Sequence, residues 1–206
     1  MSERSYGMYL AYFTLAALGF NALLAVYLGF GFGSALVGFL IAVTPFLVTR
    51  YTKIKFPWFV YFLICLAVLI HISGYIQGRY LNIPNWDTLA HTVSGSIIAL
   101  LGFVLILFLD KMRKYNLDPT FIAAFTVMFG MAGEYLWEIY EFLVDILLGG
   151  SLAGKMQADN TDTMMDMIFV FLPSVIVALG CYYYLNKNGK EKIMHEMIKD
   201  STFFPE

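Results

Sequence analysis

Residues 119–148 read PTFIAAFTVMFGMAGEYLWEIYEFLVDILL, an apolar run that opens with proline and carries four carboxylates in its second half. As a helix this run would be roughly 45 Å long. The hydrocarbon core of a bilayer is only about 30 Å thick, so the helix must tilt or project beyond it. The run therefore predicts a membrane-spanning helix with an unusually polar second half.

The four acids of this run, Glu134, Glu138, Glu141 and Asp145, define what we call the acidic face. At about 100° per residue they fall within roughly 60° of one another on the helix. One carboxylate at the bilayer centre costs about 2.5–3.5 kcal/mol, so four need protonation, pairing or a bound cation. The acidic face is therefore a candidate functional site. The alternative is a polar seam that tyrosines, serines and two histidines satisfy.

The composition places the whole chain in a membrane. Of its 206 residues, 60% are apolar and only 14% are charged, and the mean hydropathy is +0.71. Soluble domains carry about 25% charged residues. We see no basic patch that would fit nucleic acid and no nucleotide-binding or serine-hydrolase motif. These observations indicate a multi-pass protein of the cell membrane with membrane lipids as its surroundings.

Apolar runs of about 20 residues, the length that spans a bilayer, define the fold class. We expect an all-α bundle of about six transmembrane helices in one domain over residues 1–186. Residues 187–206 are expected to form a cytoplasmic tail with a short interfacial helix. The six predicted spans are 7–29, 33–50, 56–78, 87–110, 119–148 and 163–185.

The basic residues predict the orientation of these spans. Eleven of the 13 Lys and Arg residues lie at the N-terminus, in the loops at 50–55 and 111–114, or in the tail from 187. Since cytoplasmic loops carry the excess of Lys and Arg, both termini are expected to be cytoplasmic. The acids and histidines then approach the outer leaflet.

Asp87 and His91 lie four residues apart at the start of the fourth span, on one helical face. An acid and an imidazole at this spacing can share a metal ion. Asp87 is equally well explained as an N-cap. The alternative for His91 is a satisfied polar contact with a neighbour, which explains it less well because it lies one turn inside an apolar helix. His71 stands alone on the third span, where a hydrogen-bonded core histidine is as good an explanation as a ligand.

Asp159, Asp162 and Asp166 form a D-x-x-D-x-x-x-D string where the sixth span begins. Such spacing suits divalent cations that in turn hold a phosphate or diphosphate. The alternative is helix capping, because acids are favoured at a helix N-terminus. Capping explains Asp162 well and explains Asp166, one turn further in, less well.

Together, these acids and histidines from four spans predict a metal site inside a helix bundle. The mixture of imidazole and carboxylate suits Zn, Fe or Mn better than Mg or Ca. Glu138, Glu141 and His91 are the candidate catalytic residues. The candidate metal ligands are His71, Asp87, His91, Glu134, Glu138, Glu141, Asp162 and Asp166.

The order of these motifs resembles that of the YjdF-like family of small multi-pass membrane proteins. The pattern runs Trp86-Asp87-Thr-Leu-Ala-His91, then Glu134-x-x-x-Glu138-x-x-Glu141, then Asp162-Thr-x-x-Asp166-Met, and the likeness covers about residues 70–185. VanZ-like membrane proteins are similar to a lesser degree. The resemblance implies an integral membrane protein with a compact polar core and no activity that can be carried over. The polar positions that it implies as shared are Asp87, His91, Glu138, Glu141, Asp162 and Asp166.

Three functions are compatible with this sequence. The first is a metal-dependent hydrolase or transferase that acts on a lipid or lipid-linked substrate at the outer leaflet. The second is a proton or cation transporter with the acidic face as a relay, although residues 121–129 below it carry no charge. The third is a non-enzymatic membrane protein whose polar core is structural.

Overall fold

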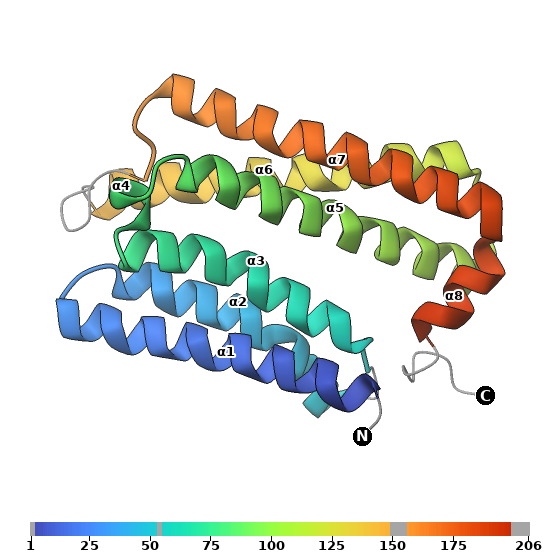
Figure 1. Cartoon of the computed structure of the whole chain (residues 1–206), viewed down its shortest axis with the longest axis horizontal. Helices are drawn as coiled ribbons and strands as arrows, with labels where there is room; N and C mark the ends of the chain where they lie inside the picture. The colour runs from blue at the N-terminus through green and yellow to red at the C-terminus, as the bar shows by residue number, and fades with distance from the viewer. Residues whose placement is uncertain (1–2, 53–54, 149–155, 199–206) are drawn as a thin grey trace. The chain divides into compact units, whose positions relative to one another are not determined.

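The computed structural model describes residues 3–52, 55–148 and 156–198, and in these ranges its regular elements are all helices (Figure 1). This result confirms the predicted all-α fold class. The helices are α1 Glu3–Leu28, α2 Phe32–Tyr51, α3 Trp58–Ile76, α4 Arg79–Asn82, α5 Trp86–Arg113, α6 Pro119–Leu148, α7 Asn160–Asn188 and α8 Lys190–Ile198.

Six of these helices are long and apolar enough to cross a membrane: α1, α2, α3, α5, α6 and α7. They match the six predicted spans to within a few residues at each end. The side of the membrane on which the termini lie stays a prediction. Lys53, Lys155 and Lys199, which enter that prediction, lie outside the described residues.

The chain divides into two compact units. Unit 1 comprises residues 1–86 and 195–206, and unit 2 comprises residues 87–194. In unit 1, α3 packs against both α1 and α2, around a core that includes Leu18 and Cys65. Gly38 of α2 permits this approach, because a Cβ there would lie 2.7 Å from the side chain of Ile72.

Small residues bring the helices of unit 2 together. A Cβ on Gly95 of α5 would lie 2.8 Å from the side chain of Val170 on α7. A Cβ on Gly130 of α6 would lie 2.3 Å from Oγ of Ser174, also on α7. Close approach through small residues is typical of helix packing in membranes. It brings α7 close to both α5 and α6.

An ion pair in unit 2 connects the end of α5 with the start of α8. Asp110 is buried, at 5% exposure, and Nζ of Lys190 donates a hydrogen bond to its Oδ2 atom at 2.8 Å. The backbone N–H of Leu117 donates to the other carboxylate oxygen of Asp110 at 2.8 Å. Lys190 also donates to the carbonyl oxygen of Leu117. This junction ties the end of α5, the loop after it and the start of α8 to one another.

Candidate metal centre

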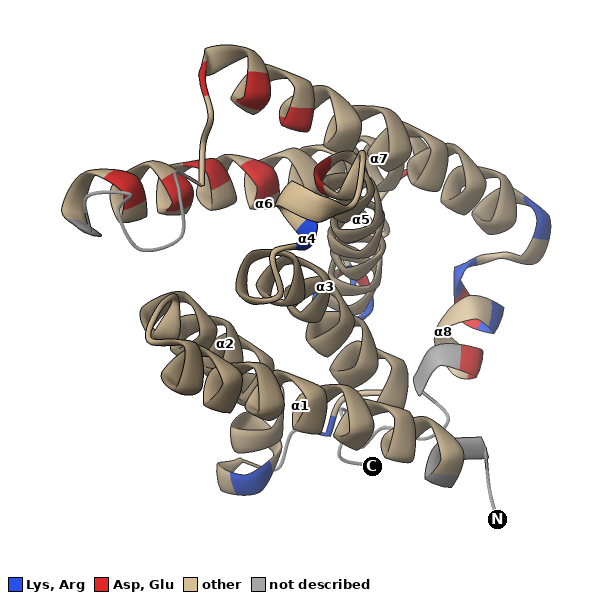
Figure 2. Ribbon diagram, turned by 60° about the vertical axis from the view of Figure 1, so that its left-hand side comes forward, with Lys and Arg blue, Asp and Glu red and all other residues tan. Residues whose placement is uncertain are grey.

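His91 of α5 is the centre of the polar cluster in unit 2. Its side chain is only 1% exposed, and its two ring nitrogens face different carboxylates. Nδ1 lies 2.8 Å from Oε1 of Glu134 on α6. Nε2 lies 3.4 Å from Oδ1 of Asp87 and 3.8 Å from Oδ2 of Asp166 on α7. Three helices therefore bring four of the predicted ligands together. Figure 2 shows the acids gathered along one end of α6 and on the first turns of α7.

The distances on the two sides of the imidazole differ in kind. The 2.8 Å separation from Glu134 is that of a charge-assisted hydrogen bond. The 3.4 Å separation of Nε2 from Asp87 is that of a long, weak hydrogen bond, and the 3.8 Å separation from Asp166 is beyond hydrogen-bond distance. Metal bonds of about 2.0–2.2 Å to nitrogen and oxygen place neighbouring ligand atoms roughly 3.0–3.6 Å apart. The ligand atoms of Asp87, His91 and Asp166 all lie within 4.8 Å of one another. The 3.4 Å separation falls within the range of a metal site, and the 3.8 Å separation is slightly longer.

The chemistry of the ring also calls for a cation at Nε2. If Nδ1 donates its hydrogen to Glu134, a neutral imidazole presents a lone pair at Nε2. Asp87 and Asp166 would then aim carboxylate oxygens at that lone pair, which is repulsive. A proton or a metal ion on Nε2 removes the repulsion. The geometry thus favours a bound positive charge between these three side chains.

Glu138 supplies an incompletely satisfied carboxylate next to this cluster. Its side chain lies within ligand distance of His91 and Glu134, and the residue is 4% exposed. Oε2 accepts a hydrogen bond from Nε2 of Gln157 at 2.6 Å. Oε1 has no hydrogen-bond partner among the described residues. An unsatisfied buried charge costs more than the 1–3 kcal/mol of a neutral group, so this oxygen is suited to a ligand.

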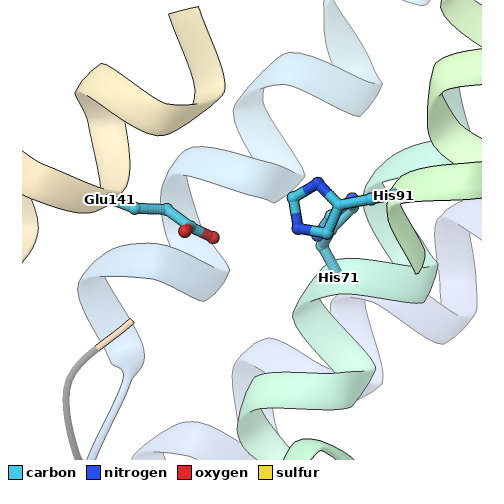
Figure 3. Close-up of side chains that lie close together, drawn as sticks. All are labelled: His71, His91 and Glu141. Atoms are coloured by element: carbon cyan, nitrogen blue, oxygen red, sulfur yellow. The ribbon is translucent and has the colours of Figure 1, made fainter. Parts of the chain in front are cut away.

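Glu141 lies one turn further along the acidic face and is also buried, at 6% exposure. Its carboxylate points toward the imidazole of His91 (Figure 3), and their ligand atoms lie within 4.8 Å of each other. Nε1 of Trp137 donates to Oε1 of Glu141 at 2.7 Å. Glu141 is therefore near the cluster, with one of its oxygens already engaged by an indole.

The remaining acids organise the segment that leads into α7. Asp145 accepts hydrogen bonds from the backbone N–H groups of Met156, at 2.8 Å, and Gln157, at 3.0 Å. Asp162 accepts one from Ala158 at 2.9 Å. Among the described residues, Asp162 belongs to none of the groups around His91. The capping alternative for Asp162 thus has a hydrogen bond in its support, and its role as a ligand stays a prediction.

Asp159 is the N-cap of α7. Its side chain accepts from the backbone N–H groups of Thr161, at 2.6 Å, and Asp162, at 3.2 Å. Hydrogen bonds from the backbone N–H groups of Asp162 and Thr161 lower the pKa of the Asp159 carboxyl. An ionised acid at this position also interacts favourably with the positive end of the helix dipole.

His71, the remaining predicted ligand, belongs to α3 in unit 1. It is 5% exposed, and its Nδ1 atom lies 3.0 Å from the hydroxyl oxygen of Tyr80. This contact supports one of the two explanations that the sequence left open for His71, that of a hydrogen-bonded core histidine. Its place among the metal ligands stays a prediction.

Gln157 is the residue near the cluster that the sequence did not single out. Its side-chain amide bonds both the carboxylate and the backbone carbonyl oxygen of Glu138, at 2.6 and 3.2 Å. The only sequence signal was its position two residues before the acid that caps α7. A polar amide so close to an acid-rich helix start can reach back to the preceding helix.

A family model described as a predicted membrane protein, DUF2238, matches residues 6–187 of the chain. No curated protein and no solved structure matches it.

Proposed function

The chain belongs to the DUF2238 family of predicted membrane proteins, the YjdF-like family, and we propose that it is a membrane-embedded metalloenzyme. The observation that carries the proposal is the arrangement at His91. Nε2 faces Asp87 and Asp166 at 3.4 and 3.8 Å, while Nδ1 is held by Glu134. A carboxylate that orients the far nitrogen of a histidine ligand is typical of metal sites.

In this proposal Asp87, His91 and Asp166 bind one divalent ion. Imidazole and carboxylate ligands suit Zn, Fe or Mn. Three protein ligands leave coordination positions open, as in catalytic rather than structural sites. The side chain of Asp87 is 40% exposed, which supports access from outside the protein core. The ion would lower the pKa of a bound water and make it a nucleophile.

Glu138 would act as the general base toward that water. Its Oε1 atom is buried and without a partner, and it lies in the group that contains His91 and Glu134. A positioned carboxylate beside a metal-bound water is sufficient for hydrolysis or group transfer. Since the site lies on membrane-spanning helices, the proposed substrate is a lipid or a lipid-linked molecule. The distribution of Lys and Arg supports a site at the outer leaflet.

A second candidate function keeps the same cluster but places a proton on His91. The cluster would then be a structural ion network, and the protein would be non-enzymatic. The 2.8 Å contact between His91 and Glu134 supports this alternative equally well. Transport along the acidic face has less support, because residues 121–129 of α6 carry no charge and the hydroxyl of Thr126 donates to the carbonyl oxygen of Ile122 in its own helix.

Metal analysis of the purified protein separates the two candidates. We expect one equivalent of a divalent metal in the wild type under metal-replete conditions, and its loss in His91→Ala and Asp166→Asn. Asp162→Asn is the matched control, because Asp162 lies on the same helix and bonds the backbone of Ala158. A wild-type protein without stoichiometric metal would leave only the protonated, structural cluster.

A further inference from the structure

A groove of about 630 Å³ lies beside the cluster within unit 2. One part of its lining is apolar and comes from α6, through Ile139, Phe142 and Ile146, all exposed. The polar lining residues include Glu138 and Asp145 of α6, and Gln157 and Asp159 of the segment before α7. A lining that contains both apolar and acidic side chains fits a molecule with a chain and a head group.

The polar part of the groove is negatively charged. Its lining contains three carboxylates, those of Glu138, Asp145 and Asp159, and no Lys or Arg of the described residues. Backbone N–H groups donate to both oxygens of Asp145. Other backbone N–H groups, those of Asp162 and Thr161, lower the pKa of Asp159. The hydrogen bonds to Asp159 favour its ionised form. The complement of such a surface is a positive charge.

Glu138 supplies an independent sign of a binding site. It is 4% exposed, it lines the groove, and its Oε1 atom has no partner among the described residues. It also belongs to the group around His91. A head group bound in the polar part of the groove would therefore lie next to the proposed metal site.

We propose that this groove binds an amphiphile whose head group carries a protonated amine, with its chain along Ile139, Phe142 and Ile146. The inference narrows the substrate class of the proposed function and rests on it for the role of the bound molecule as substrate. The amine pairs with the carboxylates, and the chain covers apolar side chains that α6 leaves exposed.

Photo-crosslinking with three matched probes tests this proposal. Each probe has a dodecyl chain with a terminal diazirine, and the head groups are an amine, a phosphate and a neutral hydroxyl. We expect the amine probe to label α6 at residues 139–146, and unlabelled dodecylamine to compete. Equal labelling by the phosphate probe would show an ordinary lipid position without charge selection and would overturn the proposal.

Two variants in the groove sharpen the test. Ile139→Trp places a larger side chain in the apolar part of the groove. The affinity for the amine probe should therefore fall by about tenfold, because the chain of the probe no longer fits. Leu143→Trp is its control, because Leu143 is exposed on the same helix outside the groove lining. Asp159→Asn keeps a capping side chain and removes one charge, so affinity should fall by about threefold for the amine probe alone. Unchanged affinity in both groove variants would overturn the proposal.

Metal content measured on the same samples keeps the two proposals apart. A protein that binds metal but shows no amine-selective labelling overturns the amphiphile inference and leaves the metal site standing. A protein that shows amine-selective labelling but binds no metal supports the groove assignment and overturns the metalloenzyme.

Discussion

Nδ1 of His91 and Oε1 of Glu134 lie 2.8 Å apart, although 43 residues separate them in the chain. Both side chains are nearly inaccessible, at 1% and 3% exposure. The bond fixes the orientation of the imidazole and turns Nε2 toward Asp87 and Asp166. Glu134 thus decides which face of the ring is available to a cation. In the proposed site it is a positioning residue, and Asp87 and Asp166 are ligands together with His91.

Loss of this hydrogen bond should weaken metal binding without removing a ligand. We expect Glu134→Leu to reduce metal affinity by about 10–100-fold, the range for residues that orient a ligating histidine. Glu134→Gln should fall between this variant and the wild type, since its amide oxygen still accepts from Nδ1. The measurement is titration against a chelating indicator. Equal affinity in wild type and Glu134→Leu would show that the imidazole needs no support.

Removal of the charge on Glu138 should separate metal binding from stability. We expect Glu138→Gln to retain the metal, because Glu138 is not among the three proposed ligands. Its free energy of unfolding should rise by about 1 kcal/mol, because a buried amide costs less than a buried carboxylate with one unsatisfied oxygen. Metal content and thermal unfolding in detergent test both. Metal loss in this variant would make Glu138 a ligand instead of the base.

The six spans could be predicted from the sequence because length and apolar content suffice to define them. The acidic face could be predicted because the spacing of its four acids matches the helical period, which puts them on one side of the helix. What lies opposite each acid could not be predicted, because partners come from other helices. Asp145 illustrates this limit, since its oxygens bond backbone N–H groups of residues 156 and 157 rather than a side chain.

The sequence also did not predict the ion pair between Asp110 and Lys190, which lies at the end of the helices where the basic residues gather. Asp110 closes the apolar span 87–110, and Lys190 is one of several lysines in the predicted tail. No period or motif links them, and only the fold places Lys190 within 2.8 Å of Asp110.

The cap of α7 predicts a pH dependence. The folded-state pKa of Asp159 is lowered from 3.8 by hydrogen bonds from the backbone N–H groups of Asp162 and Thr161. A depressed pKa stabilises the fold above 3.8, and the contribution is lost as the pH falls through the folded value. Asp159→Asn keeps the cap but does not titrate. We expect the wild type to melt higher at neutral pH and the difference to shrink below pH 3.8.

The wild type and Asp159→Asn share every other acid, so the difference between their melting temperatures reports the titration of Asp159. Melting temperatures in detergent at matched ionic strength provide the readout. A difference that stays constant across this pH range would mean that the charge of Asp159 contributes nothing beyond its hydrogen bonds.

The junction between Asp110 and Lys190 should contribute more to stability than a surface ion pair. Asp110 has a side-chain exposure of 6%, and Lys190 has one of 24%. Lys190→Met would leave a buried carboxylate whose one remaining partner among the described residues is the N–H of Leu117. We expect the free energy of unfolding to fall by roughly 1.5–3 kcal/mol, the value of a hydrogen bond to a charged group.

The chain offers its own control for this prediction. Lys111 and Glu191 form a second ion pair in unit 2, 3.3 Å apart, with side-chain exposures of 34% and 89%. Lys111→Met should therefore cost no more than about 1 kcal/mol. The double variant Asp110→Asn with Lys190→Met should recover part of the loss, since it removes the unpaired charge and keeps an acceptor for Leu117. Equal losses in Lys190→Met and Lys111→Met would mean that water reaches Asp110 and that burial does not strengthen the pair.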